Sequence, residues 1–162
     1  METERPLRGI VMTTLLATVV AGTLDMADAC LYWGITKGVP PERIFQSVAS
    51  GLLGKAAFKG GAATAALGLF LHFAIMAVMV ATYVAASVRL PALTRRPVIM
   101  GLSYGLATYV VMNSVVLPLS QVGPRGPFLL PSFINGLMAH LVLVGLTTAL
   151  IAASRKKMTN SA

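Results

Sequence analysis

Apolar residues of this chain gather in four long stretches that are separated by shorter polar segments. None of the stretches alternates polar and apolar residues, as a half-buried strand would. Each is close to or longer than the ~20 residues that a helix needs to cross the ~30 Å hydrocarbon core of a bilayer. The pattern therefore predicts four transmembrane helices, over residues of about 9–34, 60–88, 97–118 and 132–154.

The segment between the first two apolar stretches has a helical pattern of its own, over about 41–54. Pro41 suits the first position of a helix, where its missing N–H would have no partner anyway. Ile44, Val48 and Leu52 follow at four-residue spacing and share one face. We expect a short amphipathic helix here, lying at the membrane interface between helices 1 and 2.

Composition agrees with a membrane protein and excludes a soluble domain. The chain is 56% hydrophobic and only 11% charged, whereas a soluble domain carries about 25% charged residues. The predicted fold class is an all-α integral membrane protein, with residues 1–162 forming a single transmembrane domain. The lipid bilayer is accordingly the first expected partner.

The positive charges of the chain indicate its orientation in the membrane. Loops on the cytoplasmic side are enriched in Lys and Arg. With both termini on one side, eight basic residues fall there: Arg5, Arg8, Arg89, Arg95, Arg96, Arg155, Lys156 and Lys157. Five fall on the other: Lys37, Arg43, Lys55, Lys59 and Arg125. We therefore predict a multi-pass protein of a bacterial inner membrane with cytoplasmic N- and C-termini. No recognition motif accompanies the net charge of +8, so nucleic acid is not an expected partner.

Short matches between the two halves of the chain suggest an internal repeat. GLFLH at 68–72 matches GLMAH at 136–140, and RGIVM at 8–12 matches RPVIM at 96–100. In this register the halves are two hairpins of the same orientation. Such a parallel repeat is related by an axis along the membrane normal.

Each predicted transmembrane helix carries a polar residue at nearly the same depth. Asp25, His72, Asn113 and His140 each lie ~22–25 Å from the basic residue that flanks their helix, at 1.5 Å per residue. Asp28 lies one turn farther out. Small and polar residues share their helix faces, as is typical of faces that approach neighbouring helices. The sequence therefore predicts a buried polar site under the periplasmic surface.

The first interpretation of this site is that it binds a cation or relays protons. Carboxylates and imidazoles are ligands of divalent metal ions such as zinc, and both titrate when they are desolvated or paired. The candidate ligands are Asp25, Asp28, His72 and His140. The residues expected to support them are Asn113, Tyr109, Thr18 and Tyr83.

Two further interpretations stay open. In one, His72 and His140 are the axial ligands of haem b, and Arg125, Lys55 and Lys59 meet its propionates. In the other, the polar layer fixes helix register through hydrogen bonds, and the chain is an accessory or structural subunit of a larger membrane complex. No nucleophile–base constellation, phosphate loop or dinucleotide fingerprint is visible, so the sequence does not predict an enzyme.

Glycines and methionines suggest packing roles. Gly61, Gly101 and Gly105 leave small faces on the second and third helices, where a second copy of the chain could dock to form a homodimer. The nine methionines are scattered, mostly through the helices, and are interpreted as packing or lipid-facing residues.

Part of the chain, about 71–146, resembles a known family. The runs LHFAIMAVMVATYVAASVRLPAL, VVLPLS and GLMAHLVLV are similar to those of the YagU-type family of bacterial inner-membrane proteins. The matching positions are His72, Tyr83, Pro118 and His140, while the first connection departs from the family pattern. The resemblance implies an inner-membrane location and a link to acid tolerance.

Overall fold

The computed structural model describes residues 4–123 and 128–160, and every regular element among them is helical. Four helices are long and apolar enough to cross a membrane, which confirms the prediction of four spans. Their bounds are Leu7–Lys37, Gly61–Arg89, Pro97–Leu119 and Leu130–Arg155.

The helical elements follow one another with short connections. The first half contains α1 (Glu4–Lys37), α2 (Pro41–Leu53), the 3₁₀ helix η1 (Gly54–Lys59) and α3 (Gly61–Arg89). The second half contains α4 (Ala92–Arg95), α5 (Pro97–Val111), η2 (Met112–Val116), α6 (Leu117–Leu119), α7 (Leu130–Met138), η3 (Ala139–Leu146) and α8 (Thr147–Asn160). The elements α5, η2 and α6 form the third span, and α7, η3 and α8 form the fourth.

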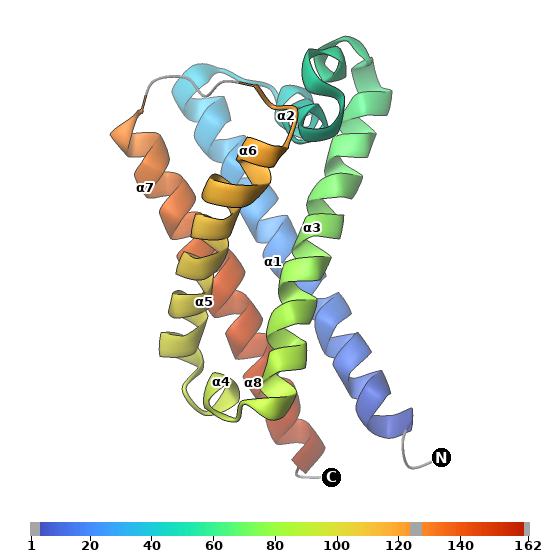
Figure 1. Cartoon of the computed structure of the whole chain (residues 1–162), viewed down its shortest axis with the longest axis vertical. Coiled ribbons are helices and arrows are strands. Elements are labelled where there is room, and N and C mark those ends of the chain that lie inside the picture. Colours follow the sequence, from blue (N-terminus) through green and yellow to red (C-terminus); the bar gives the residue numbers. More distant parts are fainter. Residues whose placement is uncertain (1–3, 124–127, 161–162) are drawn as a thin grey trace.

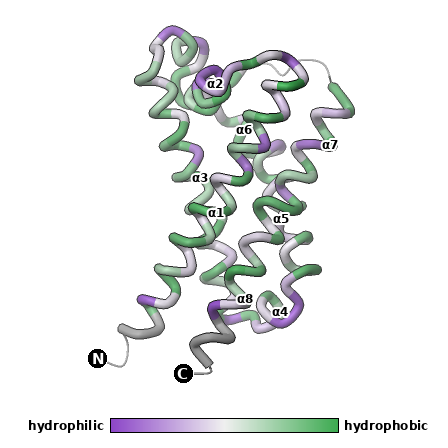
Figure 2. Tube along the Cα trace, turned by 180° about the vertical axis from the view of Figure 1, so that it is seen from behind, coloured by the Kyte–Doolittle hydropathy of each residue, from purple (hydrophilic) through white to green (hydrophobic). Residues whose placement is uncertain are grey.

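The two ends of the bundle are different. Both chain ends and α4 lie at one end, and α2 with η1 lies at the other (Figure 1). Hydrophilic residues concentrate at the two ends, and hydrophobic residues dominate the spans between them (Figure 2). This arrangement is that of a multi-pass membrane protein with an even number of crossings. The cytoplasmic side of the termini and the inner membrane stay predictions.

The half of the bundle near the chain ends, called the terminal half below, is closely packed. Its core consists of Ala17, Val80, Tyr83, Val84, Ala149 and Ala152. The alanines allow α1, α3 and α8 to approach closely, as small residues do in membrane bundles. The Tyr83 hydroxyl donates to the Leu93 carbonyl oxygen at 2.8 Å and ties α3 to α4.

Glycines bring the third and fourth spans into backbone contact. A Cβ atom added at Gly105 would lie 2.6 Å from the Leu141 Cα atom, and one at Gly101 would lie 2.9 Å from the Leu146 Cα atom. Only glycine fits at such distances. The interpretation of Gly101 and Gly105 as a free face for a second copy is therefore wrong, because these glycines are used within the chain. The homodimer itself stays a prediction.

Two segments of π-helix interrupt the third and fourth spans, η2 and η3. The wider turns change the angular phase of the residues that follow, which hydropathy does not reveal. The segments carry Met112, Asn113 and His140. Such bulges in helices occur frequently at functional sites.

The predicted short helix exists as α2, with nearly the expected bounds. Its buried residues are Ile44, Gln46, Ala49 and Ser50, whereas Leu52 of the expected face is 54% exposed. Gln46 Nε2 donates to the Gly61 carbonyl oxygen at 3.1 Å, which fixes α2 to the start of α3. Its position at a membrane interface and the parallel repeat of the two halves stay predictions.

Candidate functional site

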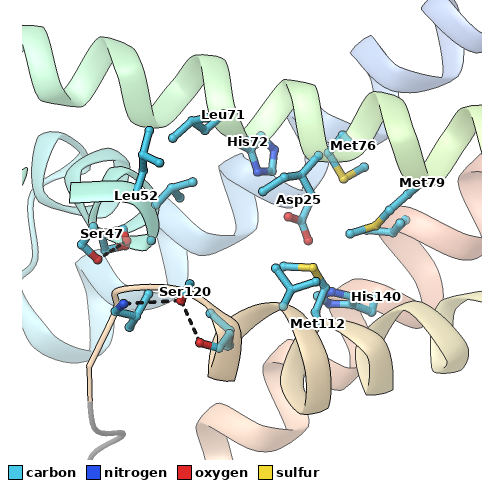
Figure 3. Close-up of a pocket in the computed structure, with 18 of the residues that line it drawn as sticks. Asp25, Ser47, Leu52, Leu71, His72, Met76, Met79, Met112, Ser120 and His140 are labelled. Carbon is cyan, nitrogen blue, oxygen red and sulfur yellow. Dashed lines mark hydrogen bonds between the residues drawn. The ribbon is translucent and has the colours of Figure 1, made fainter. Parts of the chain in front are cut away.

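A cavity of about 530 Å³ opens in the half of the bundle that carries α2, called the α2 half below. Side chains from α1, α2, α3, η2, α6 and η3 line it (Figure 3). Most of these side chains are apolar, among them Val48, Leu71, Ile75 and Val144. A volume of this size is in the range of small-molecule and cofactor sites.

Three of the lining side chains are polar residues that the sequence singled out. Asp25 comes from α1, His72 from α3 and His140 from η3. The chain has only two histidines, and both line this cavity. The structure thus brings together one carboxylate and two imidazoles from three different spans, as the comparison of their depths predicts.

Hydrogen bonds to backbone carbonyls fix both imidazole rings. His72 Nε2 lies 2.9 Å from the Gly22 carbonyl oxygen on α1, and His140 Nδ1 lies 3.0 Å from the Gly136 carbonyl oxygen. A carbonyl oxygen only accepts, so these nitrogens carry the proton. In the neutral ring the opposite nitrogen, Nδ1 of His72 and Nε2 of His140, therefore keeps a lone pair. This is the way in which metal-binding histidines are usually oriented.

Aromatic residues hold the two rings from the side. Tyr109 packs edge-on against His140, with ring centroids 5.4 Å apart, and Phe73 does the same to His72 at 5.3 Å. Asn113 Nδ2 donates to the Tyr109 carbonyl oxygen at 2.9 Å. Tyr109 thus supports His140 directly, and Asn113 lies one contact farther away.

Asp28 has a different environment from Asp25. Asn135 Nδ2 donates to Asp28 Oδ2 at 2.8 Å, and the Tyr32 hydroxyl lies 3.0 Å from Ser132 Oγ. These two pairs join α1 to α7 outside the cavity, whose lining does not include Asp28. We call them the α1–α7 clasp.

Two other predicted supporting residues lie away from the cavity lining. Tyr83 bonds to Leu93 in the terminal half. Thr18 is buried at 7% exposure, and its hydroxyl has no hydrogen-bond partner within the described part of the chain. Neither residue belongs to the cavity lining that contains the two imidazoles and Asp25.

The predicted divalent metal centre is not assembled. Among residues 4–123 and 128–160, no three His, Cys, Asp or Glu side chains come together in a way that could hold a metal ion. Asn135 engages the Asp28 carboxylate outside the cavity. Asp25, His72 and His140 line the same cavity but do not come together as ligands of one metal ion. A zinc site of Asp25, Asp28, His72 and His140 therefore does not fit this arrangement.

The haem b interpretation does not fit either. Haem-binding histidines usually ligate iron through Nε2, and in His72 this atom bonds to the Gly22 carbonyl. Lys55 and Lys59 are exposed on η1, and Arg125 lies outside the described residues. The two imidazoles therefore do not present a matched pair of Nε2 atoms to a haem.

Three methionines belong to the cavity, which the sequence interpretation missed. Met76, Met79 and Met112 line it together with the histidines (Figure 3). A signal was present, because Met76 and Met79 follow His72 by four and seven residues and so share its helix face. Their interpretation as packing or lipid-facing residues is therefore incomplete.

Comparison with known proteins adds no identity. No protein-family model, curated protein or solved structure matches the chain. The resemblance of residues 71–146 to YagU-type proteins stays a prediction.

Proposed function

We propose that this chain is a multi-pass membrane protein that binds a cation, a metal ion or a proton, at Asp25 with the help of His72 and His140. One observation carries the proposal. Asp25 is the only formally charged side chain that lines the largely apolar cavity, and no hydrogen bond or ion pair holds it within the described part of the chain.

The cost of such a charge is the physical argument. A carboxylate within the hydrocarbon region of a membrane is unfavourable by several kcal/mol unless it is paired or hydrated. A bound metal ion or proton removes that cost. The two imidazoles line the same cavity, and their lone pairs offer neutral acceptors for a proton or an ion without adding negative charge.

The different surroundings of the two aspartates support cation binding over a purely structural polar layer. Asp28 is held by Asn135 and connects two helices, as a register-fixing residue would. Asp25 makes no such connection. The structural interpretation therefore describes the α1–α7 clasp better than it describes the cavity. An inner-membrane location near the periplasmic face is part of the proposal.

Thermal unfolding of the purified protein in detergent tests the proposal. Wild type is stripped of metals, then heated at several pH values and with Na⁺, K⁺, Mg²⁺, Mn²⁺, Zn²⁺ or Cu⁺ added separately. A ligand that binds only the folded state at 100 times its Kd stabilises it by about 2.7 kcal/mol. We expect at least one cation, or acidification, to raise the midpoint of wild type and to leave that of Asp25→Asn unchanged.

Asp28→Asn is the matched control, because an Asn oxygen at this position can still accept the hydrogen bond from Asn135. It is expected to respond to cations as wild type does. The proposal is contradicted if no cation or pH change stabilises wild type, or if Asp25→Asn responds as strongly as wild type.

A further inference from the structure

We infer that the inner end of the cavity binds a soft monovalent metal ion, Cu⁺, through the thioethers of Met76, Met79 and Met112 and the imidazole of His140. The inference rests on the proposed function for the presence of a cation site, and it names the cation. Its thioether ligands differ from the thiolate, imidazole and carboxylate ligands of zinc sites.

The arrangement of the sulfur atoms is the first observation. Met76 and Met79 on α3 and Met112 on η2 point their side chains toward the space that the Asp25 carboxylate and the His140 ring also face (Figure 3). Thioethers and thiolates are soft ligands that select Cu⁺ over Mg²⁺, Ca²⁺ or Mn²⁺.

The cavity lining distinguishes Met76, Met79 and Met112 from the other methionines of the described part of the chain, including Met26, which is buried at 7% exposure elsewhere. Met76 is only 3% exposed, whereas Met12 and Met138 are 48% and 49% exposed and lie outside the cavity lining. Met76 and Met79 pack with Ala21 and Val144, and their side chains line the same cavity as both histidines.

The protonation of His140 is the second observation. Its Nδ1–H donates to the Gly136 carbonyl, which leaves the Nε2 lone pair for a ligand. Tyr109 packs against the ring and limits its rotation. His140 is thus able to ligate a metal ion through Nε2 while its Nδ1–H keeps the hydrogen bond to the Gly136 carbonyl oxygen.

Charge is the third observation. Among residues 4–123 and 128–160, Asp25 is the only formal charge in the cavity lining, and one monovalent cation balances it. A divalent ion would leave one net positive charge within the membrane, which is unfavourable. Neutral thioethers and imidazole add ligands without changing this balance.

The shape of the cavity provides a route to the site. Ser47 and Leu52 of α2 and Ser120 after α6 lie at the opposite end of the cavity from the methionines (Figure 3). A single ion fills a small part of about 530 Å³. The remaining volume connects the metal-binding end to the α2 end of the bundle.

A competition titration tests the inference. The purified protein in detergent, kept without oxygen, is titrated into the coloured Cu⁺ complex of bathocuproine disulfonate, and loss of colour reports transfer of Cu⁺. We expect wild type to remove one equivalent per chain. Met76→Leu, Met79→Leu and Met112→Leu conserve volume and leave the fold intact, and each is expected to weaken Cu⁺ binding by about tenfold or more.

Met12→Leu and Met138→Leu are the matched controls and are expected to bind as wild type does. X-ray absorption at the copper edge is expected to show sulfur and nitrogen neighbours in wild type. Failure of wild type to take up Cu⁺, or equal affinity in the three cavity variants and the controls, overturns the inference. If Asp25→Asn then still abolishes stabilisation by another cation or by acid, the proposed function stands and only the identity of the ion is wrong.

Discussion

The two halves of the bundle are packed differently: the terminal half has a closed apolar core, and the α2 half contains a cavity. In the terminal half, alanines and Tyr83 fill the space between α1, α3 and α8. None of these core residues belongs to the cavity lining. In the α2 half, α1, α3 and η2 carry Asp25, His72 and three methionines around an open volume. The same long helices thus form a closed core in one half and border a cavity in the other.

The difference teaches where function can lie in a small bundle. Close contacts through small residues hold the helices together in both halves, and in the α2 half a Cβ atom added at Gly68 of α3 would lie 2.6 Å from the Phe45 carbonyl carbon of α2. That half can then retain a charge and a cavity, although both are unfavourable for stability. Substitutions in the two halves are therefore expected to differ in the size and direction of their effects on stability.

The largest effect is expected for Gly105→Ala. The new Cβ atom would lie 2.6 Å from the Leu141 Cα atom, and backbone cannot move aside as a side chain can. We expect a loss of about 3 kcal/mol in the free energy of unfolding, at the upper end of overpacking costs. Unfolding by sodium dodecyl sulfate in mixed micelles measures it, and an unchanged midpoint would refute the close contact between the spans.

Asp25→Asn is expected to change stability in the opposite direction. In the metal-free protein at neutral pH, the substitution removes an uncompensated charge from the apolar cavity. We expect a gain of about 2 kcal/mol in unfolding free energy, within the range for charges in membrane helices. The same micelle assay measures it. A loss of stability would instead indicate that Asp25 holds helices together.

Tyr83→Phe tests the closure of the terminal half. The substitution removes only the hydroxyl that donates to the Leu93 carbonyl oxygen, while the ring still fills the core. We expect a loss of about 1 kcal/mol, the usual net contribution of one hydrogen bond. Cation binding at the cavity should be unaffected, and a change in cation affinity would show that the two halves are coupled.

Gly51→Ala is expected to have the smallest effect and provides the direct counterpart to Gly105→Ala. Here the new Cβ atom would lie 3.7 Å from the Ser120 Cβ atom, an ordinary contact. Alanine also favours the helical backbone, so we expect a gain of about 0.5 kcal/mol. A stability loss comparable to that of Gly105→Ala would show that α2 packs against the segment after α6 as closely as the third span packs against the fourth.

Much of the fold was predictable from hydropathy and spacing. The four spans follow from the length of the apolar stretches, and α2 follows from Pro41 and the periodicity after it. The meeting of Asp25, His72 and His140 follows from equal depth, because helices that start at one membrane surface rise at the same rate.

Other parts depend on contacts that a single sequence does not reveal. The π-helical turns of η3 lie where the fourth span touches α5, and those of η2 lie in the third span itself. Both segments carry residues that line the cavity. Gly105 is as suitable for a second copy as for a neighbouring span, so its partner was not predictable. The sequence does not show whether Asp28 faces the cavity or a neighbouring helix. In the structure, its hydrogen bond from Asn135 on α7 decides this.

The most direct test of the central claim is an anomalous diffraction map of crystals grown with Cu⁺ under anaerobic conditions. We predict one strong peak in the cavity, between the Asp25 carboxylate, the His140 ring and the three cavity methionines, and no comparable peak in Asp25→Asn crystals. A cavity filled only by lipid or detergent, with no ion beside Asp25 in wild type under any cation tested, would contradict the account.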